Sequence, residues 1–218
     1  MRIAKMVELP NTTRDEGDLE FYACRYDQIQ FHNLNSKVNF NKEKFESGIK
    51  YLNKEFFGLL KVFKLQYKLL FQNLKDNTNK FSNLKIITQG YDYPIPSYKL
   101  GFGLNPFKLH RPITNYLFKN GHWLKLPLQI KGIKDQETQN AILYAMIFEF
   151  NEMMIDVTSG FDNIYHIDCR GLNDKSTWYN ELHPESKVFS KIAEAYQKCI
   201  DGKIKGSHII VSEMNDVV

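Results

Sequence analysis

The side chain best placed for chemistry is a histidine in the segment Trp-Tyr-Asn-Glu-Leu-His-Pro, residues 178–184. This histidine, His183, stands directly before Pro184, which we expect to begin a helix because proline fits the first helical turn. A helix start fixes the backbone of the loop before it, so the imidazole can be directed into a cleft. There it would suit the work of a general base on a hydroxyl nucleophile. The same spacing also fits an ordinary surface histidine near a helix start.

Two other patterns resemble metal or cofactor sites, and we expect neither to be one. His166 and Cys169 are close in sequence, but they lie on opposite faces of an expected strand and therefore do not form a zinc pair. Gly-Phe-Gly-Leu-Asn-Pro at 101–106 lacks the third glycine and the preceding strand of a dinucleotide fingerprint. The three cysteines form no Cys-x-x-Cys pair, which argues against a zinc ribbon or a disulfide framework. We expect no metal and no cofactor.

The composition is that of a globular protein, and it excludes several function classes. The chain has 218 residues, of which 43% are hydrophobic and 25% charged, so wholesale disorder is excluded. Its net charge of +4 is too small to indicate nucleic acid as a partner. No apolar run reaches the ~18 residues of a membrane span, and the first residues lack the apolar stretch of a signal peptide. We expect one domain over residues 1–218, no membrane partner and a cytoplasmic location.

Apolar periodicity predicts three long helices. The first covers 41–76 with Asn41 as its N-cap, and the second covers 136–158 with Asp135 as its N-cap. The methionines of the second helix are expected to fill the core rather than to form a ligand site. The third helix covers 184–200, and its inward-facing side chains are expected to be Phe189, Ile192, Ala193 and Tyr196.

Two short β-branched runs, 84–88 and 163–168, predict buried strands between these helices. The alternation of strands with long helices predicts an α/β fold with a mostly parallel sheet, in which 84–88 is central. Functional groups in such sheets gather at the carboxyl ends of the strands, here Gln-Gly-Tyr-Asp at 89–92 and Asp-Cys-Arg-Gly at 168–171. Residues 1–40 are atypical, and 203–218 are expected to form a C-terminal tail.

The stretch 91–133 is rich in proline, glycine and aromatic residues, and it is too long for a structureless loop in a compact domain. Its aromatic side chains could line a substrate cleft or lie buried in the core. They are Tyr91, Tyr93, Tyr98, Phe102 and Phe107.

Four segments in the second half of the chain stand in a fixed order. They are Gly-Tyr-Asp-Tyr at 90–93, Gly-His-Trp-Leu at 121–124 with Pro-Leu at 127–128, Asp-x-Arg-Gly at 168–171, and Trp-x-Asn-Glu-Leu-His-Pro at 178–184. In this order and spacing they resemble segments of the SGNH (GDSL-type) hydrolases, and among these one bacterial branch.

This resemblance implies a flavodoxin-like three-layer α/β/α domain that acts on ester or acetyl groups. In the family, a serine near the N-terminus is the nucleophile, the histidine of the last block is its base, and an aspartate three residues earlier orients that histidine. His183 matches the base. The orienting position holds Asn180, which cannot supply the negative charge that stabilises an imidazolium. The adjacent Glu181 is the ionisable alternative.

The N-terminal blocks of the family are not found. Gly-Asp-Leu at 17–19 has leucine where the family has its nucleophilic serine. The family's Gly-x-Asn-Asp block, whose asparagine helps to form the oxyanion hole, is expected near 29–36 and is also missing. Asn35 could occupy the oxyanion position with Ser36 in place of the aspartate, or the segment could be an ordinary polar turn.

The resemblance therefore implies a serine esterase or acyl-hydrolase domain with an incomplete catalytic set and no identifiable nucleophile. Its substrates would be acyl esters or acetylated small molecules or glycans. A partner protein or an upstream segment would supply the serine. The alternative is a catalytically inactive binding or scaffold module on the same fold, a pseudoenzyme.

Overall fold

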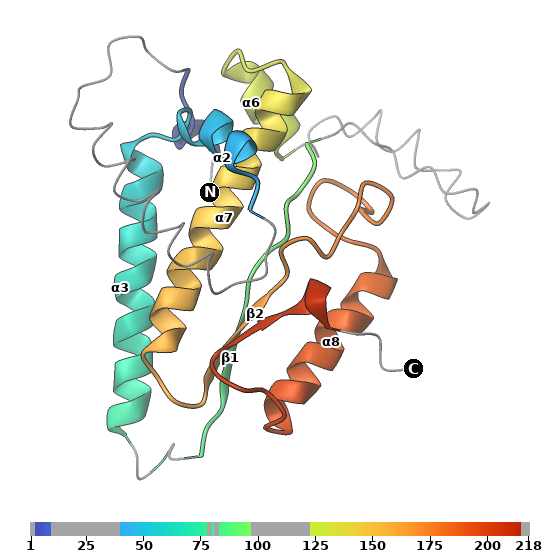
Figure 1. The fold of residues 1–218 in the computed structure, drawn as a ribbon. Coiled ribbons are helices and arrows are strands. Elements are labelled where there is room, and N and C mark those ends of the chain that lie inside the picture. The colour runs from blue at the N-terminus through green and yellow to red at the C-terminus, as the bar shows by residue number, and fades with distance from the viewer. Residues whose placement is uncertain (1–2, 10–39, 78–79, 81–82, 97–122, 215–218) are drawn as a thin grey trace.

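The computed structural model describes residues 3–9, 40–77, 80, 83–96 and 123–214, and it combines helices with a parallel sheet (Figure 1). The mixed α/β class predicted from the hydrophobic pattern is confirmed. Among the described elements, no helix has the length and apolar character needed to cross a membrane. In chain order the elements are η1 (Ile3–Lys5), α2 (Lys42–Ile49), α3 (Lys54–Asp76), β1 (Ile86–Gln89), α6 (Lys125–Ile130), α7 (Gln136–Ser159), β2 (Ile164–Asp168), α8 (Ser186–Ile200), β3 (His208–Ile210) and η4 (Val211–Glu213).

The strands of the described sheet are all parallel, in the order β1-β2-β3. Ile86 lies opposite Ile164 in the first pair, and His166 lies opposite His208 in the second. Within the described residues β2 is therefore central and β1 lies at an edge, so the central position expected for 84–88 is not found. β3 comes from the segment expected as a tail, which means that this segment contributes to the sheet.

The first long helix is divided, contrary to the prediction of one helix over 41–76. α2 begins after Asn41, whose side chain accepts a hydrogen bond from the Lys44 amide as predicted for an N-cap. The chain then turns, and Asn53 caps the start of α3 by accepting from the amides of Glu55 and Phe56. An internal capping residue thus starts a new helix within an uninterrupted apolar pattern.

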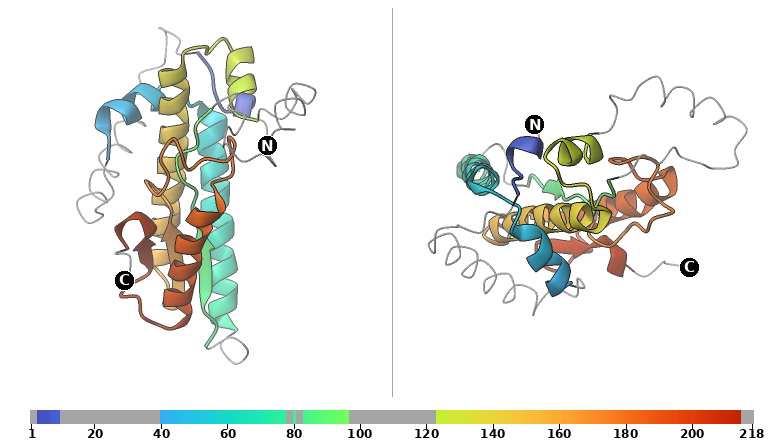
Figure 2. Two further views of the ribbon diagram at one scale, coloured as in Figure 1. Left: turned by 90° about the vertical axis from the view of Figure 1, so that its right-hand side faces the viewer. Right: turned by 90° about the horizontal axis from the view of Figure 1, so that it is seen from above.

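The two faces of the sheet are covered by different helices. Ile164 packs into a core with α2, α3 and α7, whereas Ile167 and Cys169 pack against α8. α3 lies along α7 on the side away from α8, as the views in Figures 1 and 2 agree. The predicted cap of α7 is confirmed, because the Asp135 carboxylate accepts from the Thr138 amide at 2.7 Å. Met153 and Met154 of α7 are buried in the core, as expected; Met146 is buried as well but also lines the apolar pocket described below.

α2 crosses α7 at very close range. A Cβ added at Gly48 would overlap the backbone carbonyl of Ala141, so only glycine allows this approach. Beside the crossing, the rings of Phe45 and Phe148 meet edge to face with their centroids 5.5 Å apart. The contact joins the N-terminal helices to the helix that covers the sheet.

The inward face of α8 differs from the prediction. Ile192 is buried, but Phe189 is 48% exposed and Ala193 is also exposed. Pro184 does not lie in the first turn of the helix, because it pairs with Trp178 in an isolated β-bridge. α8 begins at Ser186, and its buried face consists of Val188, Ile192, Ala195 and Cys199.

Candidate functional site

His183 lies in the loop that connects β2 to α8 at the carboxyl end of the sheet. The end of this loop is closed on itself by backbone hydrogen bonds: the Tyr179 amide donates to the His183 carbonyl at 2.9 Å, and the Glu185 amide donates to the Thr177 carbonyl at 2.8 Å. The bridge between Trp178 and Pro184 completes the closure. The segment that carries the histidine is therefore held in one conformation before α8 begins.

Asn180 orients the imidazole of His183. Its Oδ1 accepts from the amides of Leu182 and His183, each at 2.8 Å, and lies 3.0 Å from Nδ1 of His183. Backbone amides only donate, so the atom that faces the ring is the amide oxygen, and Nδ1 must carry the proton. In the neutral ring, Nε2 is then the free basic nitrogen. Since the His183 side chain is exposed, Nε2 can meet a ligand.

Glu181 does not share this arrangement. Its side chain is buried, and its two oxygens accept from the amides of Leu124 and Lys125 at 3.1 and 3.0 Å. The carboxylate thus satisfies donors at the start of α6, which have no partner within that helix. We interpret Glu181 as a residue that ties α6 to the histidine loop rather than as the partner of the imidazole.

The turn after β1 is connected to the loop after β2 through Asp92. The Asp92 carboxylate accepts from the amide of Gly171 at 2.7 Å and from the amide and side chain of Asn173 at 2.6 and 3.0 Å. Burial raises the pKa of Asp92, and these hydrogen bonds oppose the rise. Nearby, the ring centroids of Tyr91 and Trp178 are 6.0 Å apart. The two segments expected at the carboxyl ends of neighbouring strands therefore meet.

A buried ionic cluster lies beneath this edge of the sheet. Arg170 is fully buried, and its guanidinium contacts Asp168 at 2.6 Å and Glu152 of α7 at 2.8 Å. His208 of β3 lies 3.1 Å from the same Asp168 carboxylate. Burial alone would raise the pKa of Asp168, but hydrogen bonding to His208 and the charge of Arg170 hold it below its usual range. The charges of this cluster are paired with one another, although Oε2 of Glu152 is buried without a hydrogen-bond partner.

His166 and Cys169 occupy opposite sides of the sheet, as predicted. Burial lowers the pKa of His166 to about 3, so its ring is neutral. Its Nε2 lies 3.1 Å from Oδ1 of Asn151 and its Nδ1 lies 3.0 Å from the hydroxyl of Thr88. Cys169 packs against α8, where burial raises the pKa of its thiol to about 12. Among the residues that the structure describes, no cluster of three His, Cys, Asp or Glu side chains is arranged to hold a metal ion.

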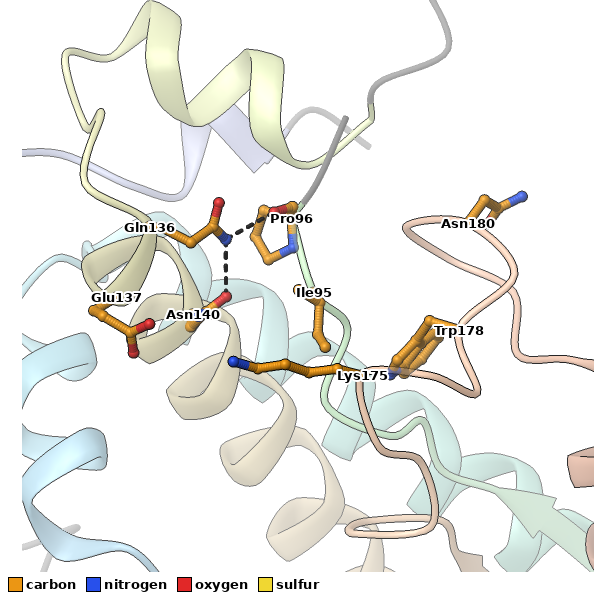
Figure 3. Close-up of a pocket in the computed structure, with 8 residues that line it drawn as sticks. All are labelled: Ile95, Pro96, Gln136, Glu137, Asn140, Lys175, Trp178 and Asn180. Carbon is orange, nitrogen blue, oxygen red and sulfur yellow. Dashed lines mark hydrogen bonds between the residues drawn. The ribbon is translucent and has the colours of Figure 1, made fainter. Parts of the chain in front are cut away.

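A small polar pocket of about 200 Å³ borders one side of the histidine loop (Figure 3). Asn180 and Trp178 line it from the loop, and Gln136 lines it from the start of α7. The Gln136 side-chain nitrogen donates to the Pro96 carbonyl at 2.7 Å and to Asn140 at 3.1 Å, so this wall is fixed. Lys175 extends from the loop toward α7 across the same pocket.

A larger apolar pocket of about 430 Å³ borders the same loop at Leu182. Leu182 lines it from the histidine loop, and the remaining described walls come from the N-terminal residues, the turn after β1, the residues directly before α6, and α7. Its lining residues are Ile3, Met6, Tyr91, Pro94, Trp123, Leu124, Leu143, Met146, Ile147 and Leu182. Among the described lining residues, Tyr91 is the one that the aromatic pattern predicted. Tyr93, another cleft candidate, instead stacks on Tyr144 in the core with ring centroids 4.4 Å apart.

The site residues predicted from sequence fall into three groups. His183 and Asn180 come together, and Glu181 is adjacent in sequence but bonded elsewhere. Asn35 and Ser36 lie outside the described residues, as do Tyr98, Phe102 and Phe107. The segment 89–92 is expected at the carboxyl end of a strand, but the sequence does not assign its Asp92 the contacts with Gly171 and Asn173 that the structure shows.

The comparisons with known proteins do not assign the chain to a family. No protein-family model matches the chain, and no match was found among curated proteins or solved structures. A functional assignment must therefore come from the geometry of the site.

Proposed function

We propose that the chain is an SGNH-like (GDSL-type) acyl-hydrolase domain in which His183 is the general base. The carrying observation is the contact between Nδ1 of His183 and Oδ1 of Asn180, which leaves Nε2 free to accept a proton. Residues three apart supply base and orienting group, as in the family that the sequence resembles. The parallel sheet, with α7 and α8 on opposite faces, supports the flavodoxin-like three-layer arrangement included in this proposal.

The chemistry would be acyl transfer through a hydroxyl nucleophile. Nε2 of His183 takes the hydroxyl proton as the oxygen attacks the ester carbonyl, and the same proton is returned to the departing alkoxide when the ester C–O bond breaks. Water then attacks the acyl intermediate with the same base and releases the acid. The nucleophile is not assigned among the described residues. Ser36, with Asn35 as an oxyanion donor, is the candidate outside them.

With Asn180 in place of an aspartate, we expect His183 to be a weaker general base than the histidine of a complete catalytic triad. The side-chain oxygen of Asn180 fixes the ring orientation and tautomer, but it carries no charge to stabilise the imidazolium that forms during proton transfer. Glu181 cannot compensate through the contacts it makes, because its carboxylate is directed at α6. We therefore expect slow hydrolysis of simple esters rather than rapid turnover.

The test is labelling of the full chain with a fluorophosphonate probe, followed by mass mapping of the modified residue. Hydrolysis of p-nitrophenyl butyrate is measured in parallel for the wild type and for His183→Ala. His208→Ala is the matched control, because that histidine lies on β3 at a different place. The proposal requires a labelled serine and turnover that only His183→Ala abolishes.

Absence of labelling, together with equal background rates for all three proteins, would overturn the enzyme proposal. The remaining candidate would then be the inactive binding or scaffold module. The two pockets beside the histidine loop would remain candidate ligand sites in that case, since a binding module needs such sites as well.

A further inference from the structure

The apolar pocket beside the histidine loop has the character of a ligand site. Its volume of about 430 Å³ lies within the range of small-molecule sites, roughly 300–1,000 Å³. None of its described lining residues is charged, and the polar groups on their side chains are the Tyr91 hydroxyl and the indole N–H of Trp123. An apolar cavity of this size needs an apolar occupant, because water would find few hydrogen-bond partners in it.

Three consecutive residues connect this pocket to the proposed base. Glu181 accepts from the amide of Leu124, which lines the pocket just before α6. Leu182 lines the pocket, and His183 carries the imidazole. The hydrogen bond from the Leu182 amide to Asn180 fixes the backbone between the pocket and the ring. A ligand whose apolar part lies against Leu182 thus contacts the residue that directly precedes His183.

Trp123 indicates where the pocket opens. Its side chain is 59% exposed although it lines an apolar cavity, whereas its neighbour Leu124 in the same lining is buried. A large exposed aromatic group at the edge of a pocket is a favourable surface for a chain that enters from solvent. Deeper in the pocket lie Leu143, Met146 and Ile147 of α7. Met146 has the flexible side chain that adapts to chains of different length.

We propose that this pocket binds the unbranched hydrocarbon chain of a medium-length acyl ester, with the ester group at His183. The position of the ester group at His183 rests on the proposed function. The binding of the hydrocarbon chain in the pocket does not depend on it. It narrows the expected substrates, because an acetyl group would leave the pocket empty. The separate polar pocket bounded by Asn180 is then left for the alcohol part of the ester.

Binding is tested apart from hydrolysis. Methyl decanoate and methyl butyrate are titrated into the His183→Ala variant of the full chain, and tryptophan fluorescence and calorimetry report binding. We expect affinity to increase about fourfold per methylene, the effect of burying one CH₂ group, until the pocket is full. Decanoate is the third ligand; tighter binding of the free acid than of the ester would overturn the assignment to an ester.

Two substitutions of matched size locate the chain. Ile147→Trp fills the pocket, whereas Ile130→Trp places the same ring on the 74% exposed side chain of Ile130 on α6, outside the lining. We expect the first to lower the affinity for methyl decanoate at least tenfold and the second to leave it unchanged. Trp123→Ala, at an exposed position, provides a second test should Ile147→Trp fail to fold. Equal affinity for the two esters, or an unchanged affinity in both pocket variants, would overturn the inference.

The results separate this inference from the proposed function. Chain-length-dependent binding without fluorophosphonate labelling or turnover would refute the hydrolase and leave the pocket assignment in place. Turnover that depends on His183 but is equal for acetyl and decanoyl esters would support the hydrolase and refute the pocket assignment.

Discussion

Oδ1 of Asn180 lies 3.0 Å from Nδ1 of His183 while it also accepts two backbone amides of the same loop. This triple acceptance determines which nitrogen of the histidine carries the proton. An asparagine in this position orients the imidazole as a carboxylate would, but it does not stabilise the charge of the imidazolium.

Replacing Asn180 by aspartate separates these two functions. Asn180→Asp keeps an oxygen acceptor in the same place and adds a negative charge beside the imidazole. We expect kcat for p-nitrophenyl butyrate to rise on the order of tenfold, because the charge stabilises the imidazolium formed in proton transfer. KM should hardly change. Asn180→Ala should lower kcat, and equal kcat values for wild type and Asn180→Asp would contradict the assigned role.

Glu181 is expected to contribute to stability rather than to catalysis. Glu181→Ala leaves the amides of Leu124 and Lys125 without their acceptor, and each unsatisfied buried donor costs about 1–3 kcal/mol. Urea unfolding should therefore show a clear loss, and Glu181→Gln, which retains one carbonyl acceptor, should recover part of it. The pH profile of ester hydrolysis should keep its shape in both variants. A shifted pH profile would show that Glu181 acts on His183.

We expect substitution by alanine to have opposite effects on stability at Gly48, where α2 crosses α7, and at Gly58, which is away from this crossing. Gly48→Ala forces a methyl group onto the Ala141 carbonyl, and we expect a loss of about 1–3 kcal/mol in the free energy of unfolding. Gly58 lies within α3 and faces open space, so Gly58→Ala should stabilise the protein by roughly 0.5–1 kcal/mol. Denaturant titrations of both variants check this. An unchanged stability of Gly48→Ala would show that the helices do not approach as described.

The neutral state of buried His166 predicts a pH dependence of stability. Its pKa is about 3 in the folded protein, mainly because of burial, and about 6.5 in an unfolded chain. Below pH 6.5 the unfolded state therefore binds a proton that the folded state does not. This contribution to stability is present above pH 6.5 and is lost as the pH falls toward 3, by at most about 1.4 kcal/mol per pH unit.

Urea unfolding of the wild type and of His166→Gln between pH 6.5 and 5 isolates this effect, because His183 and His208 are present in both. We expect the variant to be less stable at pH 7, since Thr88 and Asn151 lose their partner, but to lose less stability as the pH falls. Identical slopes for the two proteins would show that His166 does not remain neutral.

Several features of this protein follow from short-range patterns in the sequence. The caps at Asn41 and Asp135 are such features, because a capping side chain bonds an amide three residues away. The opposite orientation of His166 and Cys169 follows from the alternation of side chains along a strand. The pairing of Asn180 with His183 also spans three residues. The family resemblance drew attention to those two positions, and local chain geometry allows them to meet.

Other features depend on contacts between distant segments, which no local pattern encodes. The carboxylate of Glu181 reaches α6, 57 and 56 positions away in the chain, and Asp92 holds Gly171 across 79 positions. Apolar residues such as Leu143 and Ile147 follow the same helical period whether they fill a core or line a cavity. Which of the two they do is decided by how α7 packs against the N-terminal residues and the segments after β1 and before α6, because the volume left between packed segments depends on all their side chains together.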